Sequence, residues 1–296
     1  MLSILIPVYN YNVFRLVKTL YDQAIECNTI FEIICLDDAS TIFYEENKAI
    51  NQFGNCHYSV LEKNMGRSAI RNLLAQKATY KNLLFLDADT IPIHENFLLN
   101  YIEHLNDDTE KVVYGGILYE SKEPSEDQLL RWIYGRKREA LAVYERNKNP
   151  YLSFLTLNFL ISKSVFSKVK FNEKIPNLRH EDTLFSFELM QHKIEIVHTD
   201  NPVYHLGIEN SKEFLNKSEE AVIGLKNLVD SHLISPDYVR LSHYYQLLKK
   251  YHLQTLIAFG FRILKSFFAR QLLSKSPSLL LFDFYRLGYY CTLKSK

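Results

Sequence analysis

The residues Asn82-Leu83-Leu84-Phe85-Leu86-Asp87-Ala88-Asp89 decide the fold, because an almost entirely apolar run of strand length is followed at once by two carboxylates. Three similar apolar runs precede it, and a segment with apolar residues at helical spacing separates the first two. Such alternation predicts a Rossmann-like α/β architecture, a mainly parallel sheet flanked by helices. The expected strands are 2–6, 31–36, 58–61 and 82–86, and the expected first helix is 13–25.

The pattern continues after this run and then changes. It predicts a helix near 95–105, a strand at 111–119, a charged helix from about 125 to 146, a loop at 171–182, a helix at 183–191 and a last short strand at 195–198. Beyond residue 207 the strand signals stop and the periodicity is helical. We therefore expect two parts, an α/β catalytic domain at 1–206 and a helical C-terminal appendage at 207–296.

The composition predicts a folded chain without a general affinity for nucleic acid. The 296 residues are 47% hydrophobic and 23% charged, which provides enough apolar side chains for a buried core. The net charge is +1, so we expect no nucleic-acid partner. From Lys249 to the C-terminus, however, nine Lys and Arg stand against one acid, Asp283, so this tail carries +8 and the rest of the chain −7. The tail is therefore expected to meet an anionic partner.

The spacing of the cysteines and the lengths of the apolar runs indicate the cellular compartment of the protein. Cys27, Cys35, Cys56 and Cys291 lack the spacing of a zinc site or a disulfide framework, which favours a reducing environment. The first residues lack the pattern of a signal peptide, and no run reaches the ~18 apolar residues of a membrane span. We expect a cytoplasmic protein, either soluble or attached peripherally at the inner face of the plasma membrane.

Polar residues directly after the strands are the first candidates for a site, because ligands of open parallel sheets bind beyond the carboxyl ends of the strands. The first strand ends in Pro7-Val8-Tyr9-Asn10 and the second in Asp37-Asp38-Ala39-Ser40. An aromatic ring beside a carboxylate suits a nucleobase, since the ring stacks on its face while the acid accepts a hydrogen bond from its edge. The alternative is a turn that caps the next helix, which we favour for Ser40 alone.

Asp87 and Asp89 leave a buried strand close together, so they repel each other unless a cation lies between them. Mn²⁺ or Mg²⁺ bridging to a diphosphate would supply that charge, although Asp-x-Asp is also common in turns. Asn64-Met65-Gly66 precedes a helix in which Arg71 lies about one turn in. Arg71 is either positioned to reach a phosphate, a base edge or the acidic strand ends, or is an ordinary surface arginine.

Two further candidates lie later in the chain. Glu181 and Asp182 stand at a loop-to-helix junction, where carboxylates either complement the helix dipole or supply a general base. His205 is either a metal ligand or, as is more common for a lone histidine after a strand, a structural residue. The residues alone leave both questions open.

In their order and spacing these motifs resemble the family 2 inverting glycosyltransferases of the GT-A fold, in their non-processive form. The matching residues are Ser3-Ile4-Leu5-Ile6-Pro7-Val8-Tyr9-Asn10, Asp37-Asp38-Ala39-Ser40, Asn64-Met65-Gly66 with Arg71-Asn72, Asp87-Ala88-Asp89 and Glu181-Asp182. The family usually has Gly at the position of Ala39. The Gln-x-x-Arg-Trp motif of processive polysaccharide synthases is missing after Asp182, which points to a transferase that adds one or a few sugars.

The resemblance implies inverting transfer of a sugar from a nucleotide diphosphate donor, expected to be a UDP-sugar, to an acceptor hydroxyl. Asp89 and His205 would bind Mn²⁺ or Mg²⁺ on the diphosphate, Asp182 would be the general base, and Glu181 would orient the acceptor or that base. Tyr9 and one of Asp37 or Asp38 would hold the nucleobase, and Asp87 would face the ribose or sugar. The implied donor-binding set is Pro7, Tyr9, Asn10, Asp37, Asp38, Asn64, Gly66, Arg71 and Asp87.

The expected acceptor is a saccharide or lipid-linked saccharide of cell-surface polysaccharide or glycolipid assembly, in contact with residues 132–158. Two other functions stay open. A nucleotidyltransferase of sugar-nucleotide metabolism would share the fold, but Asn10-Tyr11-Asn12-Val13 replaces the Gly-rich basic loop that it needs. A non-catalytic scaffold would gain nothing from the clustered acids Asp87, Asp89 and Asp182.

The C-terminal region contains a helical pattern with an apolar face. That face comprises Leu253, Leu256, Ile257, Gly260, Ile263, Leu264, Phe267 and Phe268, with Arg262, Lys265, Ser266 and Arg270 opposite. Such a helix either lies on an anionic membrane surface or packs on the catalytic domain. We favour the membrane, because aromatic and basic residues continue as far as Tyr290.

Overall fold

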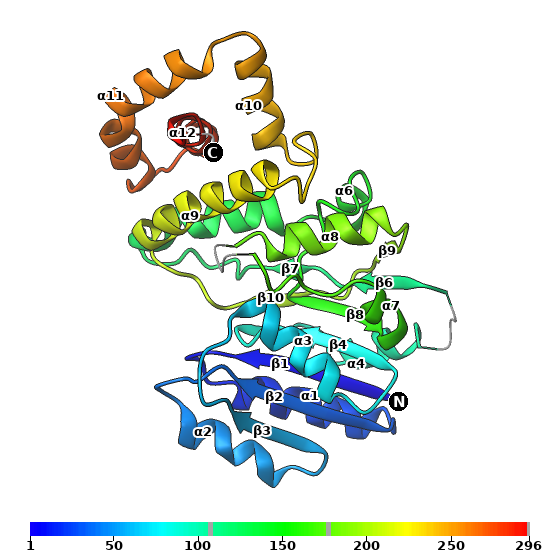
Figure 1. The fold of residues 1–296 in the computed structure, drawn as a ribbon. Helices are drawn as coiled ribbons and strands as arrows, with labels where there is room; N and C mark the ends of the chain where they lie inside the picture. The colour runs from blue at the N-terminus through cyan, green and yellow to red at the C-terminus, as the bar shows by residue number, and fades with distance from the viewer. Residues whose placement is uncertain (106–108, 176–178, 295–296) are drawn as a thin grey trace. The chain divides into compact units, whose positions relative to one another are not determined.

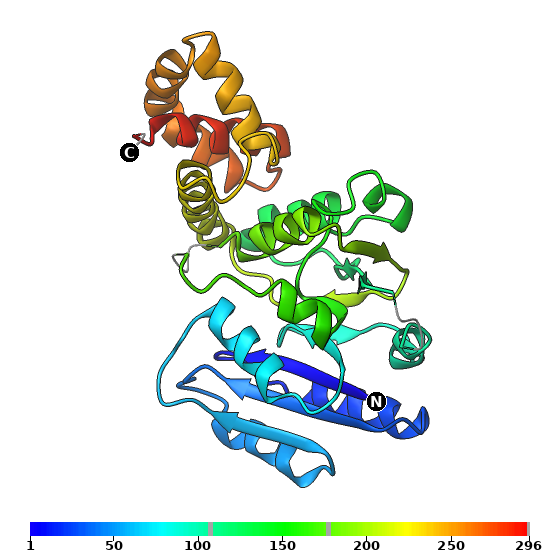
Figure 2. The same cartoon turned by 45° about the vertical axis from the view of Figure 1, so that its right-hand side comes forward.

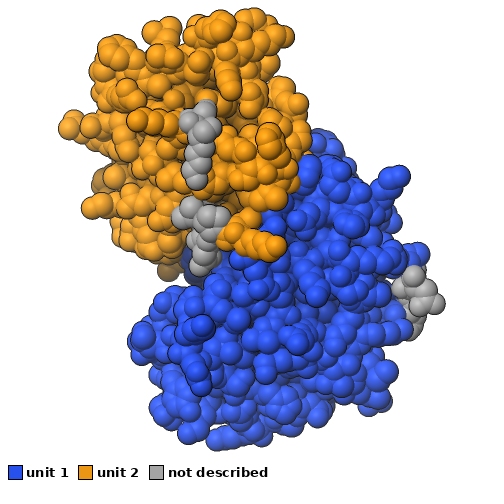
Figure 3. All heavy atoms as spheres, in the orientation of Figure 1, with its two compact units in different colours: residues 1–120, 140–173, 181–207 blue, residues 121–139, 174–180, 208–296 orange. Residues whose placement is uncertain are grey.

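The computed structural model describes residues 1–105, 109–175 and 179–294. The chain divides into two compact units (Figure 3). Unit 1 comprises residues 1–120, 140–173 and 181–207, and unit 2 comprises residues 121–139, 174–180 and 208–296. The segment 121–139, which we expected in the α/β part, therefore clusters with the C-terminal helices.

Unit 1 is built on a seven-stranded sheet, counted over the described residues, with the order β3-β2-β1-β4-β8-β6-β9 (Figure 1). The strands are β1 (Leu2–Val8), β2 (Phe31–Asp37), β3 (Cys56–Val60), β4 (Asn82–Leu86), β6 (Lys111–Tyr114), β8 (Asn158–Ser162) and β9 (Glu195–His198). β8 runs antiparallel to β4 and β6, and every other neighbouring pair is parallel. The prediction of a mainly parallel sheet flanked by helices is confirmed.

A second, three-stranded sheet in unit 1 has the order β5-β10-β7. Its strands are β5 (Thr90–Pro92), β7 (Ile117–Leu118) and β10 (Val203–His205). β10 pairs antiparallel with β5, which sets Thr90 opposite His205. This small sheet therefore joins the turn after β4 to the end of unit 1.

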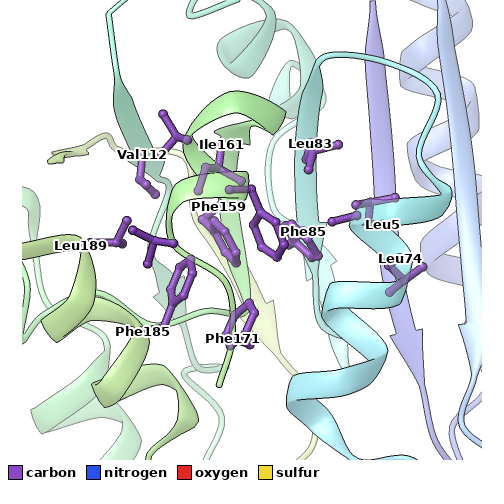
Figure 4. Close-up of a cluster of buried hydrophobic side chains, with 14 of the residues drawn as sticks. Leu5, Leu74, Leu83, Phe85, Val112, Phe159, Ile161, Phe171, Phe185 and Leu189 are labelled. Carbon is purple, nitrogen blue, oxygen red and sulfur yellow. The ribbon is translucent and has the colours of Figure 1, made fainter. Parts of the chain in front are cut away.

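Helices cover both faces of the large sheet. They are α1 (Phe14–Glu26), α2 (Tyr44–Lys48), α3 (Arg67–Lys77), α4 (Phe97–Ile102), α6 (Val143–Arg146), α7 (Lys163–Lys168) and α8 (Glu181–Gln191), with a 3₁₀ turn at Ala49–Gln52. On one face, strand residues such as Phe85 and Phe159 cluster with Leu74 of α3 and Phe185 of α8 (Figure 4). The alternate strand residues are buried on the other face, where α1 contacts β2 and α4 (Figure 2).

The described part of unit 2 is helical. It contains a 3₁₀ turn (Glu126–Gln128), α5 (Leu129–Tyr134), a π-helical turn (Gly135–Glu139), α9 (Ser211–Asp230), α10 (Arg240–Lys250), α11 (Gln254–Leu272) and α12 (Leu279–Thr292). Its core brings Leu130 of α5, Phe214 of α9, Phe261 of α11 and Phe282 of α12 together. No helix in the described ranges combines the length and the apolar character that crossing a membrane requires.

Three of the predicted elements differ in the structure. The strand expected at 111–119 is split between the two sheets, because the chain turns at Gly115 and at Gly116, whose φ is +94°. The helix expected at 125–146 is interrupted, since Ala142 is extended with φ −63° and ψ 155°. The loop expected at 171–182 ends earlier, because α8 begins at Glu181, and its residues 176–178 lie outside the described part.

Candidate active site

The loops after β1 and β2 are tied together at the carboxyl ends of the two strands. Pro7 is paired with Leu36 near the end of β1. Asn10 has a φ of +49°, and its N–H donates to Ser40 Oγ at 2.7 Å. In return, the Thr41 N–H donates to Asn10 Oδ1 at 2.9 Å. Tyr9, next to this bridge, keeps its side chain 56% exposed and is available to a ligand.

Asp37 and Asp38 use their carboxylates to hold these loops. Asp37 is fully buried and accepts hydrogen bonds from the Ser40 N–H at 2.7 Å and from the Tyr58 hydroxyl at 2.6 Å. Asp38 accepts from the Met65 N–H at 2.7 Å and from the Gly66 N–H at 3.0 Å. Two buried acids thus fix the rim around Tyr9 through local hydrogen bonds.

The segment before α3, which contains Asn64 and Gly66, also bonds to Asp38. Asn64 donates through its side-chain amide to the Asp38 carbonyl at 3.1 Å. Gly66 precedes the first residue of α3 with a φ of +86°, a conformation that favours glycine. The Asp38 carboxylate therefore lies at the N-terminus of α3, where negative charge is stabilised. Ala39 also has a positive φ, +63°, which explains why Gly would suit this turn.

Arg71 lies at the centre of an ionic cluster between α3, β4 and α8. Its Nη2 is 2.7 Å from Asp87 Oδ1, and its Nη1 is 3.7 Å from Glu181 Oε1. Its side chain is only 6% exposed, and its guanidinium lies 5.4 Å from the centroid of the Phe171 ring. Arg67 is the second cation near Glu181, at 3.9 Å. Arg71 is thus a buried arginine that neutralises acids from two distant segments.

Asp87 and Asp182, two acids near Arg71, have raised pKa values. Burial raises the pKa of Asp87, with Asp89 and Glu181 adding to the effect and Arg71 opposing it. Burial, followed by the charge of Glu181, raises the pKa of Asp182 to about 6. The Thr183 N–H donates to Asp182 Oδ1 at 2.7 Å and partly offsets that shift. A carboxylate of this pKa is ionised at neutral pH and still basic enough to accept a proton from a reacting group.

Asp89 and His205 meet at the edge of the small sheet. Oδ2 of Asp89 is 3.2 Å from Nε2 of His205, and the Leu206 N–H donates to the Asp89 carbonyl at 2.8 Å. The Asp89 carboxylate occupies the space beside Gly207 where a side chain would otherwise lie. A Cβ on Gly207 would be only 2.1 Å from Asp89 Oδ2. The rings of Tyr119 and His205 form a T-shaped pair, with centroids 5.4 Å apart.

These two side chains fit a hard divalent cation. A carboxylate oxygen and an imidazole nitrogen within one coordination sphere suit Mn²⁺, and Mg²⁺ is commonly bound through one or two protein ligands together with substrate phosphates. Within the described residues, no group of three or more His, Cys, Asp or Glu is arranged to hold a metal on its own.

The structure brings the predicted site residues into three groups: the rim at Tyr9 and Asp38, the Arg71 cluster, and the pair Asp89 and His205. Sequence reasoning missed Tyr58, Phe171 and Gly207, which support these groups. Tyr11 was also missed, although burial and the nearby charge of Asp89 raise its pKa. Of these four, only Tyr11 and Gly207 carry a signal in the sequence, since each follows a candidate residue within two positions.

Comparison with known proteins identifies the class. The architecture is the GT-A fold of glycosyltransferases, shared with the mannosyltransferase PcManGT from Pyrobaculum calidifontis in complex with GDP-Man and Mn²⁺. That match has a TM-score of 0.55 at 13% identity and covers 97% of this chain and 85% of the other. The model of the family described as glycosyl transferase family 2 matches residues 3–170. The chain belongs to this family and is a glycosyltransferase.

Two structures of TarS from S. aureus are also similar in fold. TarS 1–349 in complex with UDP-GlcNAc has a TM-score of 0.50 at 18% identity, over 76% of this chain and 66% of the other. The longer TarS chain has a TM-score of 0.53 at 16% identity, over 97% of this chain and 54% of the other. The chain thus spans just over half of the longer TarS. No curated protein matches the chain.

Proposed function

We propose that the protein transfers a sugar from a nucleotide diphosphate donor to an acceptor hydroxyl with inversion at the anomeric carbon. The observation that carries the proposal is the grouping of Arg71, Asp87, Glu181 and Asp182 beside the strand ends that hold Asp89. Cationic, acidic and metal-binding groups within one site suit a reaction in which a diphosphate leaves and a hydroxyl attacks.

The donor occupies the rim formed by the loops after β1 and β2. The exposed Tyr9 ring offers a stacking surface for the nucleobase. The Met65 side chain is also exposed, and its backbone N–H donates to the Asp38 carboxylate. The nucleotide sugars named in the TarS and PcManGT complexes support a donor of this class. We favour a UDP-sugar, and the guanine nucleotide of PcManGT makes GDP-sugars the first competitor to test.

Asp89 and His205 are the residues that hold a divalent cation on the donor diphosphate. When bound, the cation offsets the negative charge that develops on the leaving diphosphate. The Mn²⁺ named in the PcManGT complex supports this assignment. Asp87, held by Arg71, faces the ribose or sugar, and its salt bridge fixes the orientation of its carboxylate.

Asp182 is the general base. It takes the proton of the acceptor hydroxyl while the acceptor oxygen bonds to the anomeric carbon and the bond to the diphosphate breaks, so the nucleoside diphosphate leaves with the electron pair. The pKa of about 6 leaves Asp182 ionised near neutral pH. Glu181 is restrained by Arg71 and Arg67 and orients the acceptor or the base.

The acceptor is a saccharide or a lipid-linked saccharide of cell-surface polysaccharide or glycolipid assembly. Addition of one or a few sugars, rather than processive synthesis, is supported by the missing Gln-x-x-Arg-Trp motif after Asp182.

A thermal-shift screen of UDP, GDP and their sugars, with and without Mn²⁺ or Mg²⁺, tests the proposal. A ligand that binds only the folded state raises its melting temperature. We expect a metal-dependent shift with one nucleotide family that is lost in Asp89→Asn. Asp182→Asn should keep nucleotide binding and lose transfer, which separates an enzyme from a scaffold. No shift with any nucleotide under either metal would overturn the donor assignment.

A further inference from the structure

Helix α11 packs one side against α12. On that side Ala258, Phe261 and Leu272 are buried, and the Phe261 ring lies 5.2 Å from the Tyr285 ring. The approach is close, because a Cβ on Gly288 of α12 would lie 2.5 Å from the Phe261 ring. Figures 1 and 2 both show the two helices side by side. The inner side of α11 therefore already has its partner.

The opposite side of α11 is also apolar, and it is exposed. Leu256, Phe259, Ile263 and Phe267 follow one another at steps of three or four residues and form what we call the outer stripe. Their exposed fractions are 64%, 61%, 65% and 61%. An exposed apolar patch that polar residues surround marks a surface that meets another protein or a membrane, so the outer stripe is a candidate contact surface.

The contacts of Phe268 and Lys265 show which side of α11 is exposed. Phe268 stacks near Phe261 with ring centroids 6.3 Å apart, and Lys265 lies 2.8 Å from Glu219 of α9. Both residues therefore contact other parts of unit 2, although the sequence pattern placed Phe268 on the apolar face and Lys265 opposite it. The exposed residues of α11 are apolar side chains together with Thr255, Arg262, Ser266 and Arg270.

The charge around the outer stripe is strongly positive. From Lys249 onward, nine Lys and Arg accompany a single acid, Asp283, and that acid is bonded to Arg138 at 2.7 Å. Lys249 and Lys250, at the end of α10, are exposed, as are Arg262 and Arg270 on α11 itself. An exposed apolar stripe with cations on and before its helix is complementary to an anionic surface that has an apolar interior.

We propose that the outer stripe of α11 binds the surface of an anionic lipid bilayer, with Phe259, Ile263 and Phe267 entering the interface and Arg262 and Arg270 at the headgroups. A second copy of the chain fits the same surface poorly, because a symmetric contact would bring two tails of charge +8 together. This membrane contact goes beyond sugar transfer and does not depend on it, since it uses only unit 2.

Co-sedimentation of the full chain with sucrose-loaded vesicles tests the proposal. We expect binding to phosphatidylcholine vesicles that contain about one third phosphatidylglycerol, and little binding to phosphatidylcholine alone, because each cation near an anionic surface contributes about 1 kcal/mol, or roughly fivefold in partitioning. High salt should weaken the binding. Wild-type chain that stays in the supernatant with anionic vesicles at low salt overturns the proposal.

Variants of exposed residues separate insertion from simple charge attraction. The triple change Phe259→Ser, Ile263→Ser and Phe267→Ser should lower partitioning by about tenfold or more, because apolar side chains supply the interfacial transfer energy. Arg262→Gln with Arg270→Gln should lower it on anionic vesicles only. The matched control is Ile25→Ser with Ile30→Ser, exposed isoleucines of unit 1 (54% and 61%), which should bind as wild type does.

Melting curves of the variants check that they remain folded, and the donor thermal shift in unit 1 should be unchanged by them. If the triple variant binds vesicles as tightly as wild type, the outer stripe is not the membrane contact. If sedimentation equilibrium finds a wild-type dimer that the triple variant converts to a monomer, and vesicles bind neither, a second copy covers the stripe and the lipid proposal is wrong.

Discussion

Nε2 of His205 lies 3.2 Å from Oδ2 of Asp89, although Asp89 follows β4 and His205 ends β10, far later in the chain. The pairing of β10 with β5 produces this approach, because it sets His205 opposite Thr90, the residue after Asp89. The metal assignment therefore rests on a strand register that any change in the small sheet would disturb.

Loss of His205 should weaken metal binding. His205→Ala removes one of the two proposed protein ligands, so we expect the apparent Mn²⁺ affinity in the presence of nucleotide to fall by about tenfold or more. A Mn²⁺ titration of the nucleotide-dependent thermal shift measures it. The control is His243→Ala, since the exposed His243 contacts Asp237 at 2.8 Å, far along the chain from the site. An unchanged Mn²⁺ response in His205→Ala would remove this histidine from the metal site.

Loss of Arg71 should destabilise unit 1 as well as the site. In Arg71→Gln the acids Asp87 and Glu181 lose their buried partner, and removing one member of a buried pair costs about 3–5 kcal/mol. Urea unfolding measures the loss. Lys18→Gln, which breaks the exposed pair with Asp22, should cost less than about 1 kcal/mol. Equal effects of the two changes would mean that Arg71 is not the electrostatic centre of the cluster.

The sequence predicted the parts of unit 1 whose signals are local. The strands ending at Val8, Asp37 and Leu86 were found, because each is a short apolar run followed by turn residues. Strand β8, which lies between β4 and β6 in the sheet, was missed. Its sequence Asn158-Phe159-Leu160-Ile161-Ser162 follows an irregular apolar stretch, and a run of that kind does not distinguish strand from helix.

The candidate residues were found, but the contacts between them could not be predicted. Arg71 reaches Glu181 only because α3 and α8 pack on the same face of the sheet, around Phe171 and Phe185, whose rings stack at 4.3 Å. Such a contact depends on tertiary packing, which no spacing in one sequence encodes. The breaks at Gly116 and Ala142 likewise depend on which sheet or unit receives the following residues.

The pH dependence of transfer should report Asp182. Because its pKa is raised to about 6, the basic form is lost as the pH falls through that value, so kcat should fall below pH 6 and level off above it. Stability changes in the opposite sense, since the folded chain binds this proton more tightly than the unfolded chain, and that stabilisation is lost as the pH rises toward 6.

Asp182→Asn should therefore lose transfer by about 10²-fold or more, while being at least as stable as wild type at pH 8, because burial disfavours the ionised wild-type carboxylate and Asn carries no charge. Steady-state rates and melting temperatures over pH 5–9 measure both. Glu181→Gln is the companion variant: its activity should still fall with falling pH, but at a lower pH than in wild type, because the charge of Glu181 helps to raise the pKa of Asp182. If the residual activity of Asp182→Asn still falls below pH 6 as wild-type activity does, that fall is due to another group.

Gly207 should be as important to the metal site as the ligands are. A Cβ at this position would lie 2.1 Å from Asp89 Oδ2, so Gly207→Ala must displace the carboxylate or the chain around it. We expect a loss of Mn²⁺ affinity comparable to that of His205→Ala, with little change in melting temperature without metal, because Asp89 is partly exposed. The same titration measures it. Gly54→Ala is the matched control, since nothing lies within 4 Å of its added Cβ. If Gly207→Ala binds Mn²⁺ as tightly as wild type, the metal does not require the Asp89 carboxylate in its observed position. The metal site would then have to be sought around Asp87.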